Sequence, residues 1–159
     1  MATSKQKGAL GAAVGAAVLI AAPVIMKWEG KRNDPYLDIV NVPTVCWGHT
    51  GGVERGRRYS NAECEALLSE DITKHILPVI KCVPEITDRP YQLAASASLA
   101  FNIGTGAYCK STVAKRFRAK NWRGGCDAIL NWKMAGGRVV QGLVNRRMDE
   151  RRLCLTGLT

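Results

Sequence analysis

The sequence lacks closely spaced cysteines. Its cysteines are separated by 17 to 28 residues, and none lies in the first 45 positions. Without a C-x2-C pair, the chain offers neither a usual zinc-site spacing nor a thioredoxin-like redox motif. An even number of cysteines in a small domain favours disulfides formed in an oxidising compartment, with buried thiols in a cytosolic protein as the alternative. The six are Cys46, Cys64, Cys82, Cys109, Cys126 and Cys154.

The sequence also contains a long uncharged segment near its amino terminus. Residues 9–26 include no acidic or basic side chain, whereas Lys5 and Lys7 precede them. At about 1.5 Å per residue, a helix of this length reaches roughly 27 Å, close to the thickness of the hydrocarbon core of a bilayer. Seven alanines and two glycines make the segment only weakly apolar.

Four interpretations of this segment compete. A cleaved signal peptide fits the basic start, but no A-x-A site is present and Pro23 directly follows an alanine pair. A permanent membrane anchor is normally richer in leucine and isoleucine. A buried helix of a cytosolic protein is the third interpretation. The composition favours the fourth, an anchor over residues 9–26 that inserts with its lysines in the cytoplasm and is marginal enough to leave the bilayer.

No internal repeat follows, and 159 residues suffice for one domain or two small lobes that share a core. The net charge is +10, and 21 basic residues against 13 acidic ones remain beyond position 26. This excess indicates an anionic partner, which is nucleic acid, a phospholipid surface or an acidic polymer such as the bacterial cell wall. A basic surface that only aids solubility is the alternative. No RNA-module signature is present, so nucleic acid is not the expected partner.

Apolar periodicity, prolines and glycines predict an α+β chain that is mainly helical. A short helix starting at Pro23 is expected to end at Glu29, followed by extended pieces at 36–40 and 44–47. The sequence SNAE (60–63) has the form of a capping box before a helix that runs to about Ile76, with Pro78 beyond it. Further helices are expected at 91–102, 111–120, 125–132 and 143–154. We therefore expect a small mixed lobe (27–59), a connecting helix (60–77) and a helical lobe (78–159), with a substrate cleft between the lobes.

Three potentially reactive side chains follow the apolar segment in the stretch WEGKRNDPYLDIVNVPT (28–44). Glu29 is followed by Asp38 after nine residues and by Thr44 after six more. Trp28 and Met26 give Glu29 apolar neighbours, which favour the protonated form that a general acid needs. Asp38 lies in a polar context and is expected to stay ionised, with Thr44 bonding a water held near it. Two carboxyl groups in unlike environments suit glycoside hydrolysis, although this spacing alone is unspecific.

The spacing Glu-x8-Asp-x5-Thr, continued by VCWGHTG, resembles the phage-type lysozymes, the muramidases of glycoside hydrolase family 24. The stretches FNIGTGAYCKSTV (101–113), WKMAGG (132–137) and GLVNRR (142–147) resemble the carboxy-terminal lobe of that family. The resemblance covers about residues 24–155 in order. A helix present in some relatives between His49 and Ser60 is absent from this shorter loop. With the apolar segment included, the chain resembles the signal-anchor-release endolysins of lambdoid-type phages or prophages.

The resemblance implies a lysozyme-like fold, a reaction and a role for each matching residue. Glu29 would donate a proton to the glycosidic oxygen, while Asp38 and Thr44 would place or activate the attacking water. The reaction would be inverting hydrolysis of the β-1,4 bond between N-acetylmuramic acid and N-acetylglucosamine in peptidoglycan. Arg146, in VNRR, would pair with Glu29. No cofactor or metal is implied, and the enzyme would act as a monomer.

Further matching residues are assigned supporting roles. His49 would pair with Asp71 on the connecting helix, which is a structural role. Thr50, Phe101 and Ser111 fall at positions that contact glycan in relatives. Six cysteines permit 15 connectivities, and among them we expect the pairs Cys46–Cys64, Cys82–Cys109 and Cys126–Cys154.

The closeness of Glu29 to the apolar segment suggests how activity is controlled. Three residues, about 4.5 Å of helix, separate Glu29 from Met26, so a membrane-spanning segment would hold Glu29 at the membrane surface. We expect an inactive form tethered in the host inner membrane and facing the periplasm, and then a released periplasmic form in which the segment completes the first helix. Because the segment has no cysteine, the switch would be topological and would not use disulfide exchange.

Three other functions remain open at this point. A wall-binding or membrane-disrupting protein with a degenerate lysozyme fold conflicts with the intact Glu29, Asp38 and Thr44. A basic nucleic-acid binder conflicts with the anchor and the cysteines. A chitinase or a lytic transglycosylase is a chemical near-neighbour, and a transglycosylase would leave anhydro ends in digested murein.

Overall fold

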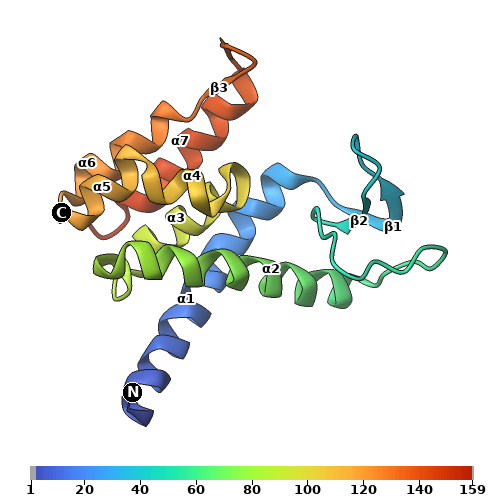
Figure 1. Ribbon diagram of the computed structural model, residues 1–159, viewed down its shortest axis with the longest axis horizontal. Helices are drawn as coiled ribbons and strands as arrows, with labels where there is room; N and C mark the ends of the chain where they lie inside the picture. Colours follow the sequence, from blue (N-terminus) through green and yellow to red (C-terminus); the bar gives the residue numbers. More distant parts are fainter. Residues whose placement is uncertain (1–2, 159) are drawn as a thin grey trace.

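The computed structural model describes residues 3–158, which form seven α-helices, two 3-10 helices and two small antiparallel sheets. This agrees with the predicted mainly helical α+β class. Figure 1 shows a helical lobe and a small β lobe joined by one long helix. The elements are α1 (Ser4–Glu29), β1 (Arg32–Leu37), β2 (Pro43–Cys46), α2 (Asn61–Cys82), η1 (Pro84–Ile86), α3 (Pro90–Ile103), α4 (Thr105–Lys110), α5 (Thr112–Arg118), α6 (Trp122–Ala128), η2 (Ile129–Asn131), β3 (Met134–Ala135), β4 (Arg138–Val139) and α7 (Gln141–Leu155).

Helix α1 is continuous through Pro23, so the expectation that a short helix begins at this proline is wrong. A capping box between Thr3 and Gln6 starts the helix, and Gly30 ends it with a φ of 64°. Proline removes one hydrogen bond from a helix interior and strains the preceding turn. Here Ala21 and Ile25, both fully buried, lie on either side of Pro23, and their packing keeps the helix intact.

The two halves of α1 differ in their surroundings. Ala17, Val18, Ala21 and Ile25 recur at helical spacing and pack into the core against α2 and α3. Residues 3–12 are exposed throughout, and this half projects away from the rest of the molecule (Figure 1). Most of the apolar segment beyond residue 12 therefore lies against the core, whereas residues 9–12 lie in solvent.

The β lobe contains one antiparallel pair, in which Tyr36 lies opposite Thr44 and Leu37 opposite Pro43. The first strand begins four residues earlier than expected, at Arg32, and ends before Asp38. Asp38 is thus the first residue of the turn that joins β1 to β2. The loop that follows β2 returns to the sheet through backbone bonds between Val45 and His49.

Helix α2 connects the two lobes and has the predicted capping box. The Ser60 hydroxyl accepts from the Glu63 amide, and the Glu63 carboxylate accepts from the Ser60 amide. The helix does not end near Ile76 but continues through Pro78 to Cys82. Burial of Ile76 and Val79 on either side of the proline, at 0% exposure, explains the continuation.

The helical lobe is built around α3, which is buried from Gln92 to Ala100 and contacts α1, α2 and α7. Two features were not expected from the sequence. Helix α4 (Thr105–Lys110) fills what was expected to be a linker. The strands β3 and β4 form a hairpin whose turn, Gly136-Gly137, has φ values of 56° and 76° that glycine adopts without strain.

The three expected disulfides are confirmed. They join β2 to α2, α2 to α4, and α6 to α7. Their sequence separations are 18, 27 and 28 residues, so each closes a sizeable loop and restricts the unfolded chain. None of the three involves α1. The pairs are Cys46–Cys64, Cys82–Cys109 and Cys126–Cys154.

Candidate active site

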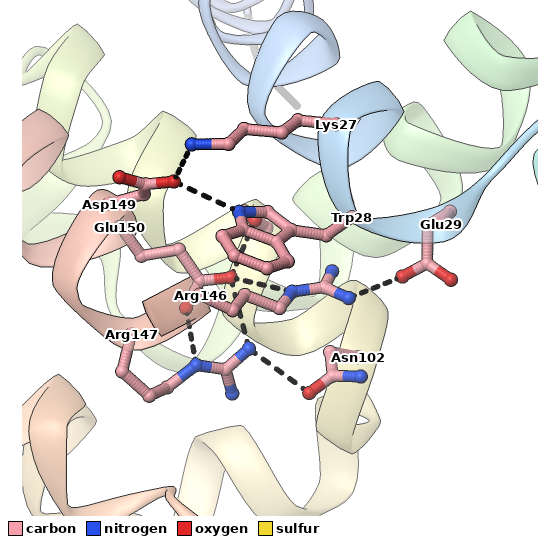
Figure 2. Close-up of polar contacts among 9 residues, drawn as sticks. Lys27, Trp28, Glu29, Asn102, Arg146, Arg147, Asp149 and Glu150 are labelled. Carbon is pink, nitrogen blue, oxygen red and sulfur yellow. Dashed lines mark hydrogen bonds and ion pairs between the residues drawn. The ribbon is translucent and has the colours of Figure 1, made fainter. Parts of the chain in front are cut away.

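Glu29 is the last residue of α1, and its side chain faces α7. Its Oε1 lies 2.6 Å from Arg146 Nη1, and its side chain keeps 24% exposure while that of Arg146 keeps 5%. Figure 2 shows the Arg146 guanidinium between Glu29 and Glu150. The carboxyl group expected to act as the acid is therefore held at the edge of the protein by the arginine expected to pair with it.

Behind Arg146 lies a buried polar cluster on α7 and α3. Glu150 Oε1 accepts from Arg146 Nε at 3.2 Å and from the Ser98 hydroxyl at 2.7 Å. Glu150 Oε2 is 2.8 Å from Arg147 Nε, and Arg147 Nη2 also donates to Asn102 at 3.0 Å. Burial raises the pKa of the Glu150 carboxyl, and the guanidinium groups and Ser98 limit the rise. Burial lowers the pKa of Arg147, although an arginine side chain stays protonated.

A second contact fastens the end of α1 to α7. Asp149 Oδ2 accepts from Lys27 Nζ at 2.5 Å and from Trp28 Nε1 at 3.2 Å, as Figure 2 shows. The Lys27 hydrogen bond lowers the pKa of Asp149, with further contributions from the charges of Lys27 and Arg152. The three residues that end α1, Lys27 to Glu29, are thus all bonded to α7.

Asp38 and Thr44 are held by the same backbone unit, Val42. Asp38 Oδ1 accepts from the Val40 and Val42 amides, both at 2.9 Å. The Thr44 hydroxyl, which is buried, donates to the Val42 carbonyl at 2.9 Å. Thr44 has therefore used its one donor, and its oxygen can only accept from a water. Among the described residues, Asp38 Oδ2 receives no hydrogen bond and remains available to a ligand or a water.

The predicted pairing of His49 with Asp71 is confirmed. His49 is buried, its Nδ1 lies 2.7 Å from Asp71 Oδ2, and its Nε2 lies 2.6 Å from the Gly51 carbonyl oxygen. The pair joins the loop after β2 to α2, and its structural role stays a prediction.

The three residues expected to contact glycan have different surroundings. Thr50 is exposed in the loop beside His49. Phe101 is half-buried at the end of α3, with its ring centroid 5.0 Å from that of His75 on α2. Ser111 is buried and caps α5, where its hydroxyl accepts from the Ala114 amide. Glycan contact by these residues stays a prediction.

The sequence did not indicate Glu150, Ser98, Asn102 or Asp149 as parts of the site. One local signal was available, since Glu150 follows Arg146 and Arg147 by four and three residues, and these are neighbouring positions on a helix. Ser98 and Asn102 lie on a different helix and have no such signal. Residues 3–158 contain no group of three or more His, Cys, Asp or Glu side chains that could hold a metal ion.

Comparison with known proteins identifies the family. A family model described as phage lysozyme matches residues 26–150. The chain belongs to the phage lysozyme family. It is therefore a glycosidase of the lysozyme type.

Among the relatives of this phage lysozyme is a protein named SAR-endolysin from Bacteriophage PS119. The two are 36% identical over 168 aligned positions, which cover 99% of this chain and 98% of the relative. The match includes the amino-terminal helix α1. The family model, in contrast, begins at residue 26 and so covers only the last four residues of this helix. By length and composition, α1 is able to cross a membrane.

Two structures of the P1 phage endolysin Lyz compare differently with this lysozyme. Its active form has a TM-score of 0.77 at 27% identity, covering 88% of this chain and 85% of that chain. Its secreted inactive form has a TM-score of 0.52 at 25% identity, covering 69% and 77%. The arrangement described here is thus more similar to the active form.

Proposed function

We propose that this phage lysozyme is an endolysin that cleaves the β-1,4 bond between N-acetylmuramic acid and N-acetylglucosamine in peptidoglycan, with inversion, and so lyses the host cell. The observation that carries the proposal is the Glu29–Arg146 pair at the end of α1. It joins the acid suggested by the spacing in the amino-terminal stretch to the arginine suggested by a distant motif. A net charge of +10 suits the acidic wall polymer.

In the proposed reaction, protonated Glu29 gives its proton to the glycosidic oxygen as the bond to the anomeric carbon breaks. A water attacks the anomeric carbon from the opposite face, and its proton passes to Asp38. Asp38 is suited to this role because two backbone amides fix Oδ1, while Oδ2 receives no hydrogen bond from residues 3–158. Thr44 accepts a hydrogen bond from the same water.

Digestion of purified murein tests the reaction. Mass spectrometry of the products is expected to show reducing N-acetylmuramic acid ends, and proton NMR at early times is expected to show the α-anomer. Glu29→Gln and Asp38→Asn are expected to remove activity while keeping the fold, because neither carboxyl group lies in the core. Anhydro-muramic ends would contradict hydrolysis and indicate a transglycosylase, and an initial β-anomer would contradict inversion.

We further propose that α1 first anchors the chain in the host inner membrane, with the enzyme facing the periplasm, and that release activates it. Support comes from the burial of Ala17, Ala21 and Ile25, which are in the core here and would face lipid in a spanning helix. The greater similarity to the active form of Lyz also supports this order of events. In the tethered state, the contacts of Lys27, Trp28 and Glu29 with α7 would be absent.

A further inference from the structure

Glu150 is a charged side chain with no exposure and with contacts to three polar groups that surround it. Its Oε1 accepts hydrogen bonds from Arg146 and Arg147 on its own helix and from Ser98 on α3, and its Oε2 forms an ion pair with Arg147. A carboxylate is costly to bury unless its partners satisfy it, so this arrangement implies a purpose other than packing. The proposed reaction, in which Glu29, Asp38 and Thr44 act, does not use Glu150 directly.

The position of Arg146 follows from Glu150. A guanidinium group is planar and rigid, so a bond from its Nε fixes the direction of its other nitrogens. With Nε bonded to Glu150, Nη1 is directed toward Glu29 (Figure 2). Arg146 Nη2 is buried without a partner, so only Nε and Nη1 hold the group in place.

The partners of Glu150 do not include α1. Arg146 and Arg147 come from α7 and Ser98 from α3, while Arg147 is braced by Asn102, also on α3. Of the two bonds that hold Arg146, the one from Nε to Glu150 is therefore present whether or not α1 has docked. The Arg146 guanidinium is thus already bonded within the helical lobe when Glu29 approaches it.

Glu150 also sets the charge near Glu29. The cluster contains two guanidinium groups and two carboxyl groups, with Lys27 and Asp149 paired to each other at its edge. The charge of Arg147 also acts on Glu29, and Glu150 offsets that charge through its ion pair with Arg147. Without the Glu150 charge, an additional buried cation would favour the ionised form of Glu29, which cannot donate a proton.

We propose that Glu150 is a positioning residue for the acid Glu29, acting through the orientation of Arg146 and through compensation of Arg147. This inference rests on the proposed function, because it assigns Glu29 the role of the proton donor.

The test is steady-state kinetics of released enzyme on soluble murein glycan fragments across pH. For Glu150→Gln we expect a kcat lower by about tenfold to a hundredfold, in line with a small displacement of a catalytic group, and an unchanged KM. We also expect the alkaline limb of the pH–kcat profile to move to lower pH. Adding Arg147→Met to Glu150→Gln removes the uncompensated cation, so the limb is expected to return toward its wild-type position.

A matched control separates positioning from stability. Tyr108→Phe removes a buried hydrogen bond to Ser96 within the same lobe, far from the cluster in the sequence, and should lower the melting temperature without changing kcat or the pH profile. If folded Glu150→Gln has wild-type kcat and pH profile, the inference is wrong. If Glu150→Gln does not fold, Ser98→Ala decides, because loss of one bond to Glu150 should lower kcat severalfold at constant KM and an unchanged kcat would overturn the inference. A wild-type enzyme that does not cleave murein would instead overturn the proposed function.

Discussion

At the residue scale, the candidate site divides into a part that the sequence predicts and a part that it does not. Glu29, Asp38 and Thr44 are close in the sequence, and their spacing resembles that of the phage-type lysozymes, so the sequence predicts them together. The pairing of Glu29 with Arg146 spans 117 residues and was expected only through resemblance to a family. Glu150 escaped prediction because an acidic residue near arginines on a helix is usually a solvated surface residue. Only the three-dimensional structure shows that this one is buried.

A first prediction concerns His49 and its bond to Asp71. His49→Asn removes the bond from the ring and is expected to lower the free energy of unfolding by about 1–3 kcal/mol, the usual range when one partner of a buried hydrogen bond is lost. Activity per folded molecule should be retained, because the pair joins a loop to α2 and does not contact the reacting groups. Urea denaturation and murein turnover measure the two quantities. A loss of turnover in fully folded enzyme would show that His49 has a catalytic role.

At the scale of elements, helix α1 was predicted as an apolar segment, but its boundary with the core was not. Composition shows that residues 9–26 are uncharged, whereas it cannot show which of them will pack against α3. The helix boundaries predicted from the prolines were wrong for the same reason. Both Pro23 and Pro78 lie inside helices because buried neighbours outweigh the local penalty, and that burial is a tertiary effect.

Two substitutions within α1 distinguish its buried face from its exposed face. Ile25→Ala removes a side chain with 0% exposure and is expected to lower the free energy of unfolding of the released enzyme by about 2–5 kcal/mol. Leu19→Ala removes a similar volume at 78% exposure and is expected to change it by less than about 0.5 kcal/mol. Both reduce the apolar character of the anchor, so Leu19→Ala is the matched control. Equal effects on unfolding would contradict the packing of α1 described here.

The capping box of α2 gives a prediction on pH. The hydrogen bond from the Ser60 amide, assisted by Arg57 and the Ser60 hydroxyl, lowers the pKa of Glu63 from 4.5 to about 2. A lowered carboxyl pKa stabilises the fold above the unfolded value, so this contribution is present above about pH 4.5 and is lost as the pH falls toward 2. Chemical denaturation of Glu63→Gln between pH 2 and 6 is expected to show a weaker dependence on pH than the wild type. An identical dependence would mean that the box does not form in solution.

At the scale of the whole molecule, the proposed anchoring would place one helix in two environments. The same residues of α1 would face lipid in the anchored state and the protein core in the released state, and small apolar side chains are acceptable in both. The mainly helical class, the two lobes and the connecting helix followed from local patterns in the sequence. The arrangement of α3 at the centre, covered by α1, α2 and α7, depends on contacts between distant segments and did not follow from them.

The glycines of the exposed half of α1 allow the two states to be tested separately. A Cβ atom added at Gly8, Gly11 or Gly15 would meet nothing within 4 Å in the fold described here. Leucine at all three positions should strengthen the anchor, so the variant is expected to remain in the membrane fraction and to delay lysis. Serine at the same positions is the control and should hasten release. Both variants, once extracted, are expected to cleave murein at the wild-type rate, and normal lysis timing in the leucine variant would contradict control by release.

The connection between α1 and the remainder of the chain is very short. Only Gly30 and Lys31 separate the end of α1 from the start of β1, a span of at most about 7 Å when extended. Under the proposed release, docking of α1 would therefore be intramolecular, with a high effective concentration that does not depend on how many enzyme molecules are present. The interval between loss of the anchor and the onset of wall cleavage should consequently be independent of expression level. Escape from the bilayer, and not the encounter of α1 with α7, would then set the time of lysis.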